Sequence, residues 1–487
     1  MHSLYGTEQM TFLSKVKGDG QCPDPDPSRL PALLPVLDPA VHRLLSDDGN
    51  RLATLTNQYG SPLNIVFPHI LGQNLARIAN AFDRHAVKSN IFYAAKVNKS
   101  HSLISAAVSC GIGVDVSSLF ELEDALVSGC DGSLICASGP AKPTDFHQKL
   151  IDVGALISID SLEELYDLVA LTGNWEQGHR TRILLRYRPI NASASRFGLA
   201  PEDMPEALRF VAQHSGDLAF EGFHFHLGGY AHENRVQAFC EITEWVRVAA
   251  DLGLSVSMID IGGGLPVRYV EPDSYAAFLA VQNGDHYRNG IVPRSFYPYG
   301  GAVDATEWID RFLLAVGPED MTVGQYLRAT GIAIGLEPGR SLADQTAISV
   351  FRITRTKNLP DGTCVLFAEG SSFSACETWF ASEFLVDPIL ISAAVPGQDN
   401  AGEKPENGPV RAYVAGHSCL DEDIISNRLI SFTTKPQKGD LLVYGNTAGY
   451  QMDLLENEFH RVPMPRRISI SADLATVQPD DQKGTSR

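Results

Sequence analysis

Residues 113–129 read GVDVSSLFELEDALVSG, and residues 157–173 read ISIDSLEELYDLVALTG. Each segment begins with a short apolar run typical of a β-strand and continues with the periodicity of an amphipathic helix. In the first segment, Ser118 and Glu121 form a Ser-x-x-Glu capping box at the start of the predicted helix, and a glycine ends that helix. The second segment repeats the pattern, which predicts parallel strands joined by helical crossovers.

The same alternation extends over about residues 62 to 345. A parallel sheet of this kind is either open and doubly wound or closed into a barrel, and the number of predicted strands, about eight, favours the α/β class with a (β/α)8 barrel. Further strands are predicted in NIFYAAK (90–96), RILLRY (182–187), GFHFHLG (222–228), SMIDIGG (257–263) and AIGLEP (333–338).

Beyond residue 345 the pattern changes to short β-like runs separated by turn residues, which predicts a second, all-β domain. Alternating Pro and Asp in residues 18–30 disfavour a packed element there. The predicted divisions are an N-terminal tail and lead-in (1–48), the barrel (49–345) with an irregular insertion at about 281–330, a C-terminal β domain (346–470) and a disordered tail (471–487).

The composition of the 487 residues is that of a globular protein, with 44% hydrophobic and 20% charged residues. A net charge of −19 argues against a nucleic-acid or anionic-membrane surface. The eight cysteines form no CxxC pair, so neither a zinc site nor a disulfide framework is indicated. No basic leader with an apolar run and no span-length apolar stretch is present, so a cytoplasmic protein is expected.

Lys96 ends a predicted strand, and barrels of this type place their active sites at the carboxyl ends of their strands. A lysine buried there could form a Schiff base, although a surface lysine just past a strand fits the local sequence equally well. His224 and His226 lie two apart on another strand and share a face. They could bind a metal, but no third ligand is evident nearby, and stacking of one ring on a flat cofactor is the better use.

A glycine run, Gly262 to Gly264, follows a third strand and would allow backbone amides to approach a phosphate closely. Glycine-rich turns after strands are common, so this signal is weak by itself. Glu337 and Arg340 flank a Pro-Gly turn after a fourth strand. They could hold a pyridine nitrogen and a phosphate, or form a local ion pair across the turn.

In this order the motifs resemble the fold-type-III pyridoxal-phosphate decarboxylases, the group of diaminopimelate and ornithine decarboxylases. The resemblance covers roughly residues 58–455. Its motifs are YGSPL (59–63), YAAKVN (93–98), GVDVSSLFEL (113–122), LLRYRP (184–189) with SRFG (195–198), HFHLGG (224–229), DIGGG (260–264), EPGRSL (337–342), HSCLDED (417–423) and TAGY (447–450).

The resemblance implies that Lys96 is the Schiff-base lysine, His226 stacks on the pyridoxal phosphate ring and Glu337 pairs with the ring nitrogen. It further implies a homodimer in which Cys419 and Asp423 reach the active site of the other subunit. Decarboxylation would pass through a quinonoid intermediate, and Cys419 would return the proton. The remaining implied cofactor-binding residues are Asp115, Arg186, Gly262, Gly263, Gly264, Arg340 and Tyr450.

Three departures from the family pattern affect the phosphate loop and the substrate side. Gly229 replaces a serine of the phosphate loop, and Leu420 replaces an acidic residue that reads the distal amine, with Asp421 as the possible substitute. Cys376 and Phe380 replace the arginine and tyrosine that bind the distal carboxylate in diaminopimelate decarboxylases. An unpaired buried carboxylate is costly, so an amino acid or amino-acid conjugate other than diaminopimelate is predicted.

Two other functions remain open. A racemase or another α-carbon reaction would keep the cofactor, although Glu337 argues against the alanine racemase branch. A non-catalytic relative would bind a partner protein instead, but the cofactor residues are retained.

Overall fold

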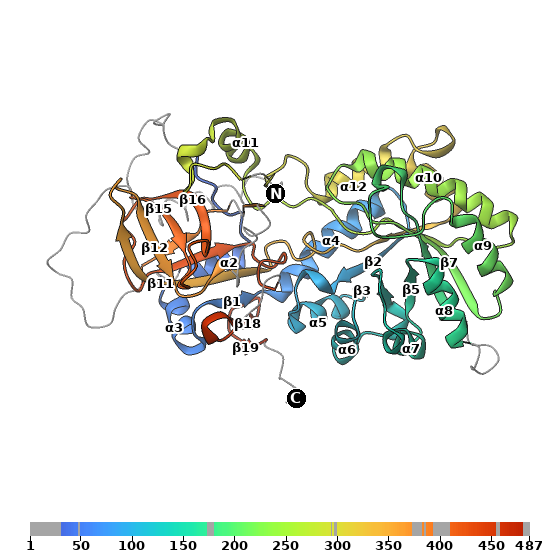
Figure 1. The fold of residues 1–487 in the computed structure, drawn as a ribbon, viewed down its shortest axis with the longest axis horizontal. Coiled ribbons are helices and arrows are strands. Elements are labelled where there is room, and N and C mark those ends of the chain that lie inside the picture. The colour runs from blue at the N-terminus through green and yellow to red at the C-terminus, as the bar shows by residue number, and fades with distance from the viewer. Residues whose placement is uncertain are drawn as a thin grey trace. The chain divides into compact units, whose positions relative to one another are not determined.

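The computed structural model describes residues 31–46, 49–172, 180–293, 295–296, 300–372, 382–383, 386–392, 410–453 and 458–480. The chain forms two compact units, each assembled from separate stretches of sequence (Figure 1). The barrel unit comprises Leu71–Val267 and Val303–Ala343, and the sheet unit comprises Met1–Ile70, Arg268–Ala302 and Asp344–Arg487.

The barrel unit contains a closed barrel of parallel strands, so the predicted (β/α)8 barrel is confirmed. In ring order the strands are β10 (Ala333–Leu336), β2 (Ser89–Ala94), β3 (Gly113–Val116), β4 (Ile135–Ala137), β5 (Leu156–Ile159), β6 (Thr181–Arg186), β7 (Leu218–His224) and β8 (Met258–Asp260). From β2 to β8, strands that follow one another in sequence are neighbours, and β10 closes the ring by pairing with both β2 and β8.

Helices connect these strands and lie outside them (Figure 1). The predicted serine cap forms, because Ser118 Oγ accepts a hydrogen bond from the backbone N–H of Glu121. The Glu121 carboxylate accepts its hydrogen bond from the N–H of Ser117, one residue before the cap, so the reciprocal bond of a capping box is shifted by one residue. Each cap fixes a helix start directly after a strand. The helices are α4 (Pro68–Arg84), α5 (His101–Ser109), α6 (Leu119–Val127), α7 (Thr144–Asp152), α8 (Leu162–Thr172), α9 (Met204–Gln213), α10 (His232–Asp251), α12 (Ala305–Leu314) and α13 (Val323–Thr330).

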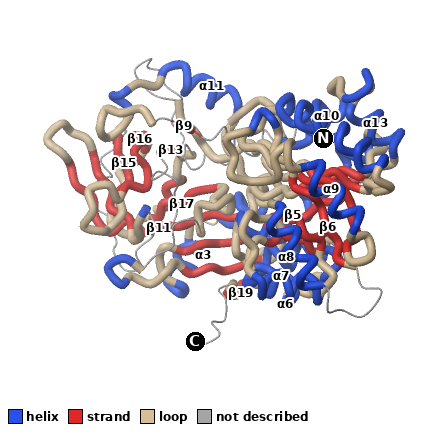
Figure 2. The backbone as a smooth tube through the Cα atoms, turned by 45° about the vertical axis from the view of Figure 1, so that its right-hand side comes forward, coloured by secondary structure: helices blue, strands red, loops and turns tan. Residues whose placement is uncertain are grey.

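The sheet unit is built on a nine-stranded sheet, which gives the chain its separate, second domain (Figure 2). Apolar side chains of β1, β11, β17 and β18 form its main buried cluster together with α2 (Pro39–Leu45) and α3 (Asn50–Tyr59). The strands are β16 (Ile424–Phe432), β15 (Val410–Ala415), β12 (Cys364–Ala368), β11 (Ala347–Asn358), β1 (Leu63–Val66), β18 (Arg466–Ile470), β19 (Val477–Pro479), β17 (Leu441–Gly445) and β14 (Ile389–Ile391).

Strand β1 differs from the predicted division, which placed residues 49–345 in the barrel. It pairs antiparallel with β11 and parallel with β18, so the stretch that contains it belongs to the sheet unit. All four residues of β1 are buried. Its apolar sequence LNIV satisfies a central strand of either unit, and the choice is made by the partner strands far away in sequence.

The predicted insertion at 281–330 also divides between the two units. Residues up to Ala302, with α11 (Pro272–Val281), belong to the sheet unit, and the helices α12 and α13 belong to the barrel unit. In addition, β9 (Ser295–Phe296) pairs with β13 (Ser382–Glu383).

The predicted disordered tail is ordered in part, because β19 pairs antiparallel with β18. Residues 481–487, like residues 1–30, lie outside the described residues. Within the described chain, no helix combines the length and the apolarity needed to cross a bilayer.

Candidate active site

Lys96 lies at the carboxyl end of β2, in the short 3-10 turn Ala95–Val97. Its Nζ is 3.2 Å from Oδ2 of Asp115, which lies on the adjacent strand β3. The Asp115 side chain is fully buried, whereas 36% of the Lys96 side chain is exposed. The Lys96 amine is therefore held in place by the Asp115 carboxylate, and the side chain remains partly accessible.

Glu337, Asp260 and His224 form a buried cluster where β10, β8 and β7 end. Glu337 Oε1 lies 3.5 Å from His224 Nε2, and within the described residues this oxygen has no hydrogen-bond donor. Burial, together with the charges of Asp115 and Asp260, raises the pKa of Glu337 well above its usual value. The site therefore has a place for a cationic or N–H group that would hold this carboxylate ionised.

Asp260 connects this cluster to the glycine turn that follows β8. Its Oδ1 accepts a 2.8 Å hydrogen bond from the N–H of Gly262, while Oδ2 has no partner among the described residues. Burial, together with the smaller effect of the Asp115 charge, raises the pKa of Asp260 to about 7.

We expect Asp260→Asn to change how the stability of the cofactor-free protein depends on pH. Unfolded, Asp260 ionises near 3.8, but folded it keeps its proton to about 7. The folded state therefore binds more protons within this window, and its free energy of unfolding falls as the pH rises through it. Relative to wild type, the asparagine variant should gain stability from about pH 4 to about pH 7 and stay level above.

Urea unfolding at a series of pH values measures this difference. Asp251→Asn, at the exposed end of α10, is the control and should show no trend. A constant difference between Asp260→Asn and wild type across the series would contradict the buried, protonated state of Asp260.

His226 follows β7, and its Nδ1 accepts a 3.2 Å hydrogen bond from the N–H of Gly263. Burial and the positive charge of Lys96 lower the pKa of His226 to about 3, so the ring is neutral at neutral pH. His224 uses its Nδ1 differently, against Ser158 Oγ at 2.6 Å. The two histidines therefore make separate contacts, and the glycine turn fixes the orientation of the His226 ring.

The glycine turn fits closely between its neighbours. Gly262 and Gly264 have φ values of +70° and +84°, which side chains disfavour. A Cβ on Gly263 would lie 2.6 Å from the carbonyl oxygen of Glu337, and a Cβ on Gly264 would lie 2.3 Å from Nη2 of Arg235. Only backbone without side chains fits here, as expected for a turn that cradles a small anion.

Arg186 and Arg340 complete the part of the barrel unit that was singled out from the sequence. The Arg186 guanidinium donates to Asp160 at 2.8 Å and lies 4.6 Å from the ring centroid of Phe197, in the SRFG motif. Arg340 Nη1 donates to the hydroxyl of Tyr230 at 3.3 Å.

The predicted residues Cys419, Asp423 and Tyr450 belong to the sheet unit. Cys419 is an exposed free thiol, and the neighbouring Leu420 and Asp421 are exposed as well. Asp423 is buried, and its two oxygens accept hydrogen bonds from the N–H groups of Ser372 and Ser418.

Asp423 therefore holds the loop in shape, whereas Asp421 and Glu422 are exposed, and Glu422 forms an ion pair with Arg288. Tyr450 has a φ of +77°, a value rare for a residue with a side chain. Cys376 and Phe380 lie outside the described residues.

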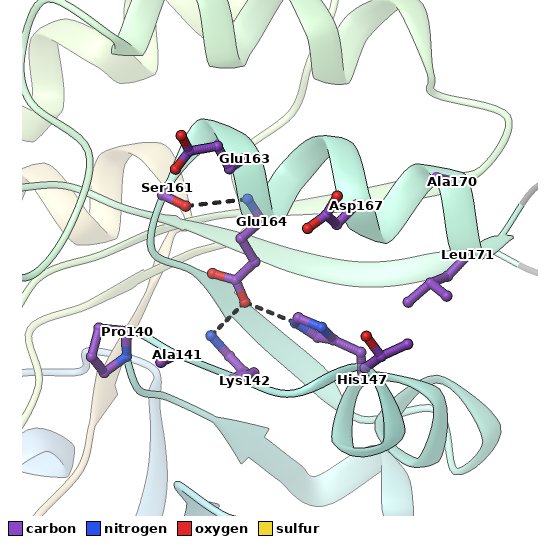
Figure 3. A pocket seen from close by; sticks show the side chains of 11 residues that line it. Pro140, Ala141, Lys142, His147, Ser161, Glu163, Glu164, Asp167, Ala170 and Leu171 are labelled. Atoms are coloured by element: carbon purple, nitrogen blue, oxygen red, sulfur yellow. Dashed lines mark hydrogen bonds and ion pairs between the residues drawn. The ribbon is translucent and has the colours of Figure 1, made fainter.

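A cavity of about 440 Å³ lies beside α7 and α8, apart from the residues described above (Figure 3). At its base, Glu164 Oε1 lies 2.6 Å from Lys142 Nζ and 2.9 Å from His147 Nε2. Burial opposes ionisation, but the hydrogen bonds from His147 and Lys142 hold the pKa of Glu164 below its usual value. These three polar side chains therefore pair with one another at the base of the cavity.

Known proteins with similar sequences point to the same family as the motifs. The model of the pyridoxal-binding domain of pyridoxal-dependent decarboxylases matches residues 71–285. The uncharacterized protein y4yA of Sinorhizobium fredii (strain NBRC 101917 / NGR234) is 50% identical over 441 residues, covering 91% of this chain and 94% of that protein. The diaminopimelate decarboxylase of Staphylococcus aureus (strain COL) is 24% identical over 432 residues, covering 85% and 89%.

Solved structures share the fold. Diaminopimelate decarboxylase from M. jannaschii in complex with L-lysine gives a TM-score of 0.66 at 18% identity, covering 89% of this chain and 92% of that chain. The Paramecium bursaria Chlorella virus arginine decarboxylase bound to agmatine gives 0.63 at 16%, covering 86% and 99%. With the strand-end lysine, the buried glutamate and the glycine turn in place, the chain belongs to the fold-type-III family of pyridoxal-phosphate-dependent decarboxylases.

Proposed function

We propose that this protein uses pyridoxal phosphate to remove the carboxylate of an amino acid or an amino-acid conjugate, which leaves an amine. One observation carries the proposal: Glu337 is buried at the barrel mouth, and one of its oxygens has no hydrogen-bond donor among the residues that the structure describes. A protonated pyridine nitrogen would supply that donor and a compensating positive charge. Such a pair favours cleavage of a bond that leaves its electron pair on the α-carbon, as the departure of carbon dioxide does.

The residues at the mouth fit the remainder of the cofactor. Lys96 offers an accessible amine for covalent attachment, next to a buried carboxylate that holds its position. The neutral His226 ring, held by Gly263, can lie against a flat aromatic group without adding charge. Within the glycine turn, the N–H groups of Gly262 and Gly263 donate to Asp260 and His226, so the N–H of Gly264 would be the donor that the turn offers to a phosphate.

When bound, pyridoxal phosphate supplies an electron sink for the bond that breaks at the α-carbon. Lys96 would hold the cofactor through its amine and would give up that link to the substrate amine, while Asp115 would keep the released Lys96 amine at the site. Glu337, when ionised, would hold a proton on the ring nitrogen. Cys419, on the exposed loop of the sheet unit, would return the proton to the α-carbon from the partner subunit of a homodimer.

The exposed loop favours a substrate other than diaminopimelate. Leu420 is 45% exposed and offers an apolar surface beside Cys419, with the carboxylate of Asp421 next to it. A substrate with an apolar or conjugated side chain and a distal amine would match this pair. The lysine and agmatine named for the solved decarboxylases are amines of the class expected as products.

Release of carbon dioxide from the holoenzyme tests this function. A panel should include lysine, ornithine, arginine and diaminopimelate in both configurations, together with conjugates in which the distal group is acylated. Turnover that is fastest with a substrate lacking a distal carboxylate is the expected result. Racemisation or α-proton exchange with full retention of the carboxylate would contradict decarboxylation.

We expect Gly264→Ala to weaken binding of pyridoxal phosphate by about tenfold or more, because its Cβ would press on Arg235 and displace the turn. Gly253→Ala is the matched control. Gly253 has a similar φ of +78° but open space around its Cβ position. Both variants should lose about 1 kcal/mol of stability to backbone strain, yet only Gly264→Ala should lose cofactor affinity. Equal cofactor affinity in both would contradict the cradle.

A further inference from the structure

Arg235, in the first turn of α10, is fully buried behind the glycine turn. Its Nη2 donates hydrogen bonds to three backbone carbonyl oxygens, those of Leu227 at 2.8 Å, Gly229 at 3.0 Å and Gly263 at 3.1 Å. Leu227 and Gly229 lie in the loop after β7, and Gly263 lies in the turn after β8. One side chain therefore ties together two loops that are 34 residues apart in sequence, as counted from Gly229 to Gly263.

The guanidinium carries a buried charge without an acidic partner. Among the described residues, no carboxylate forms an ion pair with Arg235, and burial lowers the pKa of the guanidinium to about 10. Its positive charge is only partly offset by the three carbonyl dipoles and by the ring of Trp308, whose centroid is 5.5 Å away. A buried cation of this kind is costly unless an anion lies near it.

The geometry of the peptide bond determines where the N–H groups next to these three carbonyls point. In a trans peptide the N–H points away from the preceding C=O. Because three carbonyls point toward Arg235, the N–H groups of Gly228, Tyr230 and Gly264 point away from it. Arg235 thus turns the positive ends of three peptide dipoles away from itself, as an anion-binding loop requires.

The helix α12 supports the same loop from another direction. Trp308 Nε1 donates a 2.7 Å hydrogen bond to the backbone oxygen of Tyr230, and Arg340 donates to the hydroxyl of that tyrosine. Trp308 is 2% exposed and contacts the Arg235 guanidinium with its ring. The second half of the predicted insertion is thereby connected to the candidate phosphate site.

We propose that Arg235 is a positioning residue for the phosphate of the cofactor, a role that rests on the proposed use of pyridoxal phosphate. It orients the loop N–H groups and places a permanent positive charge behind them. Gly229 stands where relatives of this family carry a serine, so this chain lacks a hydroxyl donor in the loop. The clamp on the carbonyl of Gly229 compensates for that loss through the backbone.

The test compares the affinities of pyridoxal phosphate and of pyridoxal, which lacks the phosphate, for the wild type, Arg235→Met and Arg235→Lys. The methionine variant should bind pyridoxal phosphate roughly tenfold to a hundredfold more weakly, while its affinity for pyridoxal changes little. The lysine variant, which keeps the charge and N–H donors, should recover part of the loss. Arg247→Met, an exposed arginine of the same helix, is the control.

A second readout uses inorganic phosphate alone. Phosphate should raise the melting temperature of the cofactor-free wild type and of Arg247→Met, but not of Arg235→Met. Trp308→Phe removes the hydrogen bond to Tyr230 and shortens the ring that contacts Arg235. It serves as the second variant if Arg235→Met does not fold, and it should show a smaller selective loss.

Equal losses for the two aldehydes in all Arg235 and Trp308 variants, or no loss, would overturn the phosphate role. If the wild type itself bound no pyridoxal phosphate, the proposed function would fail first, so the two failures are distinguishable.

Discussion

Replacement of Lys96 by alanine is expected to lower turnover of the amino-acid substrate by roughly a thousandfold or more. The reason is that Lys96 supplies the covalent attachment at the barrel mouth, with its amine held 3.2 Å from Asp115. Steady-state carbon dioxide release measures the effect. Lys88→Ala, an exposed lysine just before β2, is the control and should keep wild-type turnover.

Added primary amines sharpen this result. If the Lys96 amine forms the covalent link, methylamine in millimolar amounts should restore part of the turnover of Lys96→Ala and leave the control unchanged. Turnover within a factor of a few of wild type in Lys96→Ala would contradict the assigned role, because a different lysine would then hold the cofactor.

Glu337→Gln is expected to lower turnover by roughly a hundredfold to ten-thousandfold while leaving the protein folded. A neutral amide cannot hold a proton on the ring nitrogen, so the electron sink weakens. Pyridoxal phosphate should still attach to Lys96, because the glutamine does not disturb the amine or the glycine turn. Glu163→Gln, on the exposed face of α8, is the control and should have no effect on turnover.

Stability separates this effect from misfolding. Burial raises the pKa of Glu337, so the cofactor-free protein pays a cost to ionise it, and the glutamine variant should be at least as stable as wild type at neutral pH. Loss of turnover together with undiminished stability would support the ring-nitrogen role. Wild-type turnover in Glu337→Gln would exclude it.

The barrel could be predicted from the sequence because neighbouring residues mark where its strands and helices begin and end. Capping residues such as Ser118 and Glu121 mark each helix start, and the apolar runs before them mark the strands. The placement of β1 could not be predicted in this way. Its four residues are compatible with either unit, and its partners β11 and β18 lie roughly 280 and 400 residues away.

Some residues of the candidate site could likewise be predicted from the sequence, and others could not. Lys96 and Glu337 could be found because each ends a strand and carries a side chain whose chemistry is rare there. The sequence did not reveal the role of Arg235, since its contacts are to backbone carbonyls that any sequence would present. Asp423 was predicted to contact substrate from its motif position, but only the structure shows that backbone N–H groups engage both of its oxygens.

The central claim is that Lys96 holds pyridoxal phosphate at the mouth of this barrel. The most direct test is the absorption spectrum of the purified protein supplied with pyridoxal phosphate, before and after borohydride reduction, followed by mass mapping of the labelled peptide. The account predicts a band near the visible edge that reduction removes, and a pyridoxyl group on the peptide that carries Lys96. No band, or a label confined to another lysine, would contradict it.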